Sequence, residues 1–170
     1  MSALLDIPAG QPDESRLLLP MTPVDVDAVL AIEAGVYAFP WTRGNFIDSL
    51  AAGYDARLLR VGADRLLQGY FVAMTGVDEM HLLNITVAAP AQRQGHARFM
   101  LDELVRRCRE LRLGRLWLEA RESNAVARAA YRRLGFAEVG VRPGYYPAAR
   151  GRRETAVVMS LEVGGGAGPG

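Results

Sequence analysis

The feature that most constrains this fold is a junction between an apolar run and an amphipathic segment near the middle of the chain. Residues 80–88 are mostly apolar, which is typical of a buried strand. Residues 95–112 carry apolar side chains at helical spacing among several arginines, which predicts an amphipathic helix. The linking segment 92–97 reads Gln-Arg-Gln-Gly-His-Ala and contains two small residues. These patterns predict a strand, a tight turn and a helix in direct succession.

This junction is a candidate phosphate site. The first N–H groups of a helix have no partner within the helix, and the helix dipole adds partial positive charge at the same end. Gly95 and Ala97 would let a pyrophosphate approach the backbone, because larger side chains would obstruct it. A turn before a helix also needs small residues for structural reasons alone, and short glycine motifs arise by chance. Residues 92–97 therefore leave both interpretations open.

The rest of the chain predicts a single α/β domain. A helix begins at Thr22, the segment 38–41 ends it, and Thr42 can cap a second helix to about Ala52. Strand patterns cover 16–21, 56–61, 66–75, 80–88, 115–120, 136–141 and 155–163, and a last helix covers 124–134. This order predicts a mixed sheet that is neither doubly wound nor barrel-like. We expect a flexible N-terminal tail over 1–15, a folded domain over 16–163 and a disordered glycine-rich tail over 164–170.

Composition argues against several classes of function. No apolar run approaches the roughly 20 residues that a membrane span needs, and no secretory signal is visible, so we expect a cytoplasmic protein without membrane association. The net charge of +1 argues against general nucleic-acid binding, although all 20 basic residues are arginine. Cys108 is the only cysteine, so an internal disulfide is impossible, and we expect it to be a small core residue.

A second group of candidate residues follows in 117–136. Glu119 interrupts the apolar run 116–120 and shares a strand face with Trp117. Helices on both faces of the sheet would bury this carboxylate partly, so it needs either a function or a partner such as a neighbouring arginine. Tyr131 lies among small residues, where it can be a core aromatic or a functional hydroxyl. Asn124 can cap the following helix or hold a ligand.

Together these blocks resemble the GNAT N-acetyltransferase superfamily. Residues 83–87 followed by 92–97 are similar to its strand and acetyl-CoA pyrophosphate loop, and 124–136 is similar to its strand–helix block beneath the pantetheine arm. Within the superfamily, segments 38–41, 117–124, 142–147 and 153–156 resemble the RimI group, which acetylates the N-terminal alanine of ribosomal protein bS18. The resemblance covers about 17–161. Departures are Ala97, where many members have glycine, and His96, Phe99 and Met100 in place of commoner aliphatic residues.

The resemblance implies a GNAT-like mixed, mostly antiparallel central sheet of about seven strands with helices on both faces. It also implies acetyl-CoA as co-substrate and no metal. The backbone of Ile85, Thr86 and Val87 would meet the pantetheine arm. The pyrophosphate would be surrounded by Arg93, Gln94, Gly95, His96, Ala97 and Arg98, and Asn124 would also contact the cofactor.

The same resemblance implies that Glu119 is the general base and Tyr131 the general acid in acetylation of a protein N-terminus, with bS18 as the expected partner. Two segments could form the walls of the acceptor groove. One contains Phe39 and Trp41, and the other is a turn containing Tyr145 and Tyr146; surface-loop packing is the alternative.

Two other functions remain open from the sequence. One is acetylation of a small amine or a lysine side chain, and the other is a CoA-binding module without catalysis.

Overall fold

The computed structural model describes residues 15–164, which form one seven-stranded sheet. The strand order is β1-β2-β3-β4-β5-β7-β6, with β4–β5 parallel and the other neighbours antiparallel. The mixed, mostly antiparallel sheet expected from the sequence is therefore confirmed. The predicted tails lie outside the described residues, apart from Ser15 and Gly164. The strands are β1 Arg16–Pro20, β2 Asp55–Val61, β3 Leu66–Thr75, β4 Glu79–Val87, β5 Arg115–Arg121, β6 Ala137–Pro147 and β7 Arg153–Glu162.

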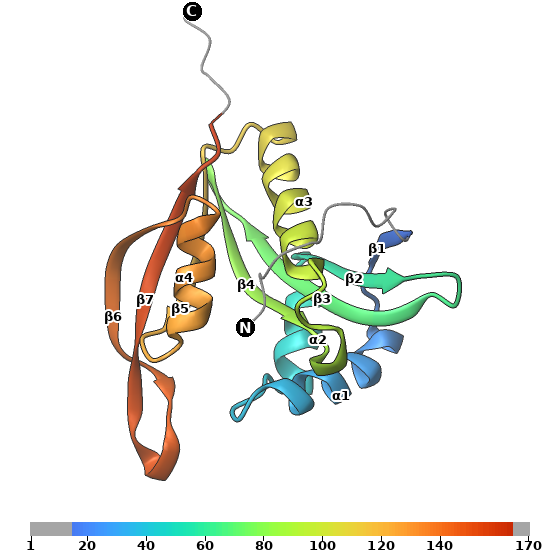
Figure 1. Ribbon diagram of the computed structural model, residues 1–170, viewed down its shortest axis with the longest axis horizontal. Coiled ribbons are helices and arrows are strands. Elements are labelled where there is room, and N and C mark those ends of the chain that lie inside the picture. Colours follow the sequence, from blue (N-terminus) through green and yellow to red (C-terminus); the bar gives the residue numbers. More distant parts are fainter. Residues whose placement is uncertain (1–14, 165–170) are drawn as a thin grey trace, which may run out of the picture.

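Helices cover both faces of this sheet (Figure 1). On one face lie α1 (Val26–Val36) and α2 (Arg43–Ala51), and on the other lie α3 (His96–Glu110) and α4 (Ala125–Arg133). Short 3-10 turns occur at Pro23–Asp25, Ala89–Ala91 and Ala149–Gly151. Thr42 caps α2 as predicted, because its hydroxyl accepts a hydrogen bond from the Asn45 backbone N–H at 3.2 Å.

Two apolar clusters hold these layers together. The larger one joins α3 and α4 to β2–β5 and β7, and it includes the buried Cys108, as the sequence predicted. The smaller one joins α1 and α2 to β2 and β3 around Phe46 and Tyr70. The larger cluster thus crosses the middle of the sheet, whereas the smaller one stays on the β1–β4 half.

The two parallel strands separate part of the way along their length. Their pairing runs only from Glu79 opposite Arg115 to Leu82 opposite Leu118, after which β4 and β5 diverge (Figure 1). At this point β4 also has a register shift against β3, which leaves Leu83 as an extra residue. In the part of the chain that the structure describes, no strand lies between the edges of β4 and β5 that face each other beyond this point. This opening positions the candidate site.

The C-terminal hairpin corrects one sequence prediction. The strand expected over 136–141 continues as β6 to Pro147, so Tyr145 and Tyr146 lie in a strand and not in a turn. The proline and glycine of segment 142–147 mark a bulge, because the pairing of β6 with β7 shifts between Arg142 and Tyr146. Arg153 supports this bulge by donating to the carbonyl of Tyr145 at 2.8 Å. The hairpin projects beyond the body of the molecule in Figure 1.

Candidate active site

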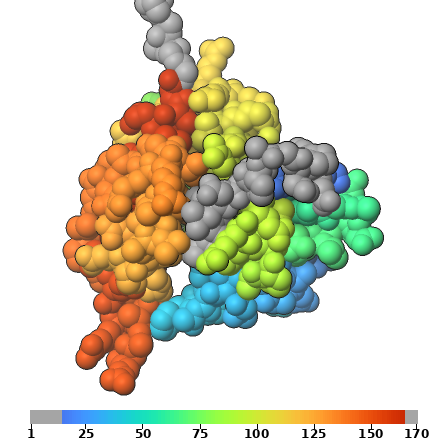
Figure 2. Space-filling model, in the orientation of Figure 1, coloured from blue at the N-terminus to red at the C-terminus, as the bar shows by residue number. Residues whose placement is uncertain are grey.

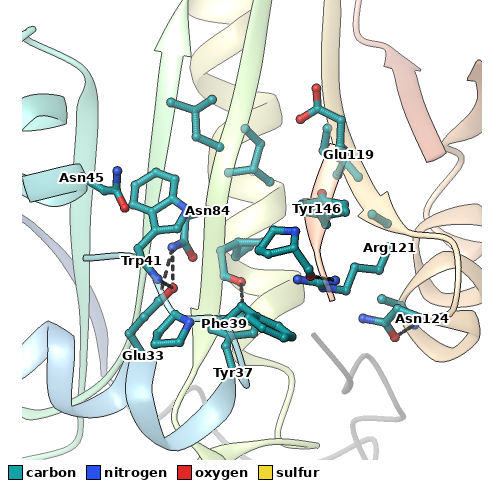
Figure 3. A pocket seen from close by; sticks show the side chains of 18 of the residues that line it. Glu33, Tyr37, Phe39, Trp41, Asn45, Asn84, Glu119, Arg121, Asn124 and Tyr146 are labelled. Atoms are coloured by element: carbon teal, nitrogen blue, oxygen red, sulfur yellow. Dashed lines mark hydrogen bonds between the residues drawn. The ribbon is translucent and has the colours of Figure 1, made fainter. Parts of the chain in front are cut away.

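A cleft of about 380 Å³ opens where β4 and β5 diverge. Figure 2 shows a hollow between the α1–α2 region and the C-terminal half of the chain, and Figure 3 shows side chains of both walls around β4. Of the residues predicted to form a site, those that line the cleft are Phe39, Trp41, Ile85, Glu119, Asn124, Tyr131 and Tyr146. The splayed strands therefore bring together side chains from four distant segments of the sequence.

The predicted turn between β4 and α3 has the geometry of an anion site. Gly95 has φ 83° at the N-terminal end of α3, a left-handed conformation that favours glycine. No side chain of the described residues 15–164 caps this end of the helix, so the first N–H groups of α3 can meet a ligand or water. Arg93 and Arg98 are exposed on either side of the turn. These features fit a pyrophosphate, although none of residues 92–98 lines the cleft itself.

Arg16 of β1 holds this turn from the far edge of the sheet. Its Nη2 donates to the carbonyl of Gln94 at 2.8 Å, and its Nε donates to Nδ1 of His96 at 3.1 Å. Burial lowers the pKa of His96, and the positive charge of Arg16 lowers it further. The imidazole therefore stays neutral as the acceptor of this hydrogen bond near neutral pH. No local sequence pattern indicates this long-range contact.

Glu119 is a buried carboxylate, as its position in β5 predicted. Its side chain is 6% exposed, and Oε2 lies 2.9 Å from Nε2 of His81 on β4. Oε1 lies 3.3 Å from Nε of Arg142, but among the described residues it has no hydrogen-bond partner. The arginine contact is thus an ion pair without hydrogen-bond geometry. The carboxylate has two neighbours and still keeps one oxygen for a ligand.

Tyr131 lines the same cleft from α4 and is also part of the core. Its ring packs edge-on against Phe136, with 5.5 Å between the ring centroids. Burial raises the pKa of its hydroxyl well above the usual value, and the hydroxyls of Tyr37 and Tyr146 add to the shift. Asn124 caps α4, because its Oδ1 accepts from the backbone N–H of Ala127 at 3.2 Å. Both of these residues combine a structural contact with a position at the cleft.

The backbone segment predicted to meet the pantetheine arm lies along the open edge of β4. Ile85 lines the cleft, whereas Thr86 and Val87 are buried beside it. The carbonyl of Ile85 accepts a hydrogen bond from the Tyr37 hydroxyl at 3.1 Å. Burial raises the pKa of Tyr37, so this hydroxyl stays protonated. Tyr37 thereby connects the end of α1 to the strand that borders the cleft.

Arg121 lies between the two proposed walls of the acceptor groove and contacts both of them. The guanidinium of Arg121 lies 5.4 Å from the ring centroid of Phe39 and 4.7 Å from that of Tyr146 (Figure 3). Trp41 lines the cleft beside Phe39. Tyr145 does not line the cleft and instead contacts Arg142 and Tyr146. The structure therefore places Tyr146, but not Tyr145, at the groove.

Sequence reasoning missed a buried polar network on the α1 wall. The Glu33 carboxylate accepts hydrogen bonds from the Tyr70 hydroxyl, from Asn84 Nδ2 at 3.2 Å and from the backbone N–H of Trp41 at 3.1 Å. Burial raises the pKa of Tyr70, and the negative charge of Glu33 raises it further. Two features of the sequence could have indicated this network. Glu33 follows Val29 by four residues on the buried helix face, and Asn84 interrupts an apolar strand.

Residues 15–164 contain neither a metal-binding cluster nor a membrane-spanning helix. This part of the chain has no cluster of three or more histidine, cysteine, aspartate or glutamate side chains that could hold a metal ion. It also contains no helix with the length and apolar character needed to span a membrane.

Comparison with known proteins identifies the family. The profile of the acetyltransferase (GNAT) family matches residues 30–136. A Salmonella typhimurium protein named ribosomal protein bS18-alanine N-acetyltransferase is 35% identical over 143 residues, covering 84% of this chain and 95% of that protein. The protein of the same name from Escherichia coli K12 is 36% identical over 140 residues, covering 82% and 92%.

Solved structures agree with these relatives. The crystal structure of the Escherichia coli ribosomal-protein-S18-alanine N-acetyltransferase superposes with a TM-score of 0.81 at 32% identity, covering 92% of this chain and 99% of that chain. Arabidopsis thaliana Naa50, in complex with a bisubstrate analogue, shares the fold at a TM-score of 0.73 and 16% identity, covering 87% of this chain and 99% of that chain. The resemblance expected from the sequence is confirmed, and the chain belongs to the GNAT acetyltransferase family.

Proposed function

We propose that this chain transfers the acetyl group of acetyl-CoA to the N-terminal α-amine of a protein, with the N-terminal alanine of ribosomal protein bS18 as acceptor. The observation that carries the proposal is that Glu119 and Tyr131 line one cleft beside the open edge of β4. The names of relatives that cover more than four-fifths of this chain support the choice of acceptor.

The donor side of the site fits acetyl-CoA. The N-terminus of α3 would hold the pyrophosphate, and the pantetheine arm would follow the backbone of residues 85–87 toward the cleft. Asn124 lies across the cleft and would contact the cofactor from α4. Acetyl-CoA supplies a thioester, whose carbonyl carbon the acceptor nitrogen attacks.

Glu119 is proposed as the base because the attacking amine must be neutral. Its Oε1 would take the proton from the acceptor ammonium, either directly or through a water molecule. An α-amine with a pKa of about 7.7–8 is roughly a tenth neutral at pH 7, whereas a lysine amine near 10.4 is less than a thousandth neutral. The neutral fraction of an α-amine is therefore over a hundredfold larger than that of a lysine amine, which favours a protein N-terminus over a lysine side chain as acceptor.

Tyr131 is proposed as the acid that assists the leaving thiolate. When the tetrahedral intermediate breaks down, the C–S bond cleaves and negative charge develops on sulfur. The ordinary pKa of a tyrosine, about 10, already exceeds that of a thiol, about 8.5, and burial raises the pKa of Tyr131 further, so complete proton transfer is uphill. The hydroxyl therefore contributes mainly by donating a hydrogen bond to the sulfur as charge forms, and solvent completes the protonation.

The acceptor would enter between the α1–α2 loop and the C-terminal hairpin. Phe39 and Trp41 form one side of this entrance, and Tyr146 forms the other. Arg121 joins the two sides by stacking with Phe39 and Tyr146, and it also donates to the carbonyl of Pro147 at 2.8 Å. A groove with aromatic side chains on both sides suits an extended N-terminal peptide.

The test is a thiol-release assay with acetyl-CoA and a peptide that begins Ala-Arg. The proposal expects turnover on this peptide and none on the same peptide with a blocked N-terminus. Free polyamines and an internal lysine peptide serve as alternative acceptors. Turnover on either of these, without turnover on the Ala-Arg peptide, would refute the proposed acceptor.

A further inference from the structure

The proposed chemistry leaves one buried histidine unused. His81 lies on β4 directly opposite Trp117 on β5, within the short segment where the two strands are paired. Its side chain is 9% exposed, and its ring stacks on the Trp117 indole with 3.6 Å between ring centroids and 9° between planes. A polar ring in this position needs a hydrogen-bond partner. Glu119 supplies it, at 2.9 Å from Nε2.

We propose that His81 is a positioning residue for the base, which it holds so that Oε1 of Glu119 faces the acceptor. This inference rests on the proposed function, because it assigns a role relative to Glu119 as base. His81 does not line the cleft, so it acts through Glu119 and not on the substrate.

The two carboxylate oxygens of Glu119 have different surroundings. Oε2 is engaged by His81, whereas Oε1 is buried and lacks a hydrogen-bond partner among the described residues. A buried carboxylate oxygen without a hydrogen bond is costly unless a ligand or water supplies one. The His81 contact therefore determines which oxygen remains for the acceptor ammonium.

The second neighbour of Glu119 cannot fix the carboxylate in the same way. Arg142 approaches Oε1 at 3.3 Å without a hydrogen bond, and its side chain is 48% exposed. Its guanidinium also lies over the Trp117 and Tyr145 rings, at 5.7 and 5.4 Å from their centroids. The His81 ring, in contrast, is held in one plane by the stack on Trp117. Without His81, the exposed side chain of Arg142 would be the remaining neighbour of the carboxylate, and Oε2 would no longer be held away from the acceptor.

The kinetic test compares His81→Leu with His81→Gln. The leucine variant removes the donor, and we expect kcat on the Ala-Arg peptide to fall by on the order of 10–10²-fold, with KM for acetyl-CoA changing less than about threefold. The glutamine amide can reach the position of Nε2 and should restore most of the rate. Met80→Leu, which alters a buried residue next to His81 on the opposite strand face, is the control and should keep wild-type kcat. A wild-type kcat in His81→Leu, or a glutamine variant as slow as the leucine variant, would overturn the role.

A second measurement does not depend on activity. The chain has two histidines, so both imidazoles can be assigned in ¹H–¹⁵N correlation spectra by comparison with His81→Gln. The proposal expects neutral His81 to carry its proton on Nε2, and expects this preference to be lost in Glu119→Ala. A proton on Nδ1 alone in the wild type would refute the contact. If the wild type acetylates a different amine, the proposed acceptor is wrong, and the same kcat comparison is made with that amine.

Discussion

Replacing Glu33 with alanine should lower the free energy of unfolding more than replacing any exposed charged residue of this chain. The change leaves the Tyr70 hydroxyl and the Asn84 amide buried without their acceptor. Each unsatisfied buried polar group costs about 1–3 kcal/mol, so the two together predict a loss of about 2–6 kcal/mol. A domain of this size is stable by about 5–15 kcal/mol, so the loss is a large fraction of the total.

The measurement is urea unfolding at pH 7, followed by tryptophan fluorescence, of the single and double variants of Glu33→Ala and Tyr70→Phe. Because these side chains share a hydrogen bond, Tyr70→Phe should cost less in the Glu33→Ala background than in the wild type, by about 1.5–3 kcal/mol. Glu110→Ala is the matched control. It breaks an exposed ion pair with Arg106 and should change stability by less than about 1 kcal/mol.

Two results would refute the reasoning. One is a Glu33→Ala protein that is no less stable than Glu110→Ala. The other is a Tyr70→Phe change that costs the same in both backgrounds, since this would show that the hydroxyl and the carboxylate do not stabilise each other.

Three further variants test the rest of the site. Tyr131→Phe should lower kcat by roughly 10²–10³-fold if the hydroxyl donates a hydrogen bond to the leaving thiolate, and a near-normal rate would remove it from that role. Gly95→Ala forces a side chain into φ 83°, at about 1–2 kcal/mol, so KM for acetyl-CoA should rise, and an unchanged KM would contradict a role of this turn in binding the pyrophosphate. The lowered pKa of His96 means that the unfolded chain binds more protons, so its contribution to stability is present above about pH 6.5 and is lost as the pH falls below it. His96→Gln should flatten this acid-side fall of Tm, and an unchanged slope would argue against His96 as its source.

Most helices and strands could be predicted because their sequence patterns depend on residues that are near one another in the chain. The strand that became β3 was predicted at its observed bounds, and the strands and helices from Glu79 to Arg133 were predicted to within two residues of theirs. Alternation along β5 placed Glu119 on the face opposite Leu116 and Leu118, and the structure agrees. These features depend on hydrophobic period and capping, which neighbouring residues determine.

The rest depended on contacts that are distant in sequence. Segment 142–147 has turn-forming residues, but pairing with β7 makes it a bulged strand. His81 and Glu119 are 38 residues apart, and only the parallel pairing of β4 with β5 brings them together. Arg16 and Gln94 meet across even more of the chain. A single sequence carries no local pattern for such contacts.

The unequal reach of the two apolar clusters has a consequence for acceptor choice. The larger cluster ties α3 and α4 to both halves of the sheet, so the elements proposed to hold the cofactor are fixed relative to one another. The smaller cluster stays within the β1–β4 half of the sheet. Across the cleft, the contact between the two sides is the polar and aromatic stack of Arg121 with Phe39 and Tyr146. We therefore expect related enzymes to change acceptors by substitutions in the α1–α2 loop and the C-terminal hairpin, while the donor end of the molecule keeps its packing unchanged.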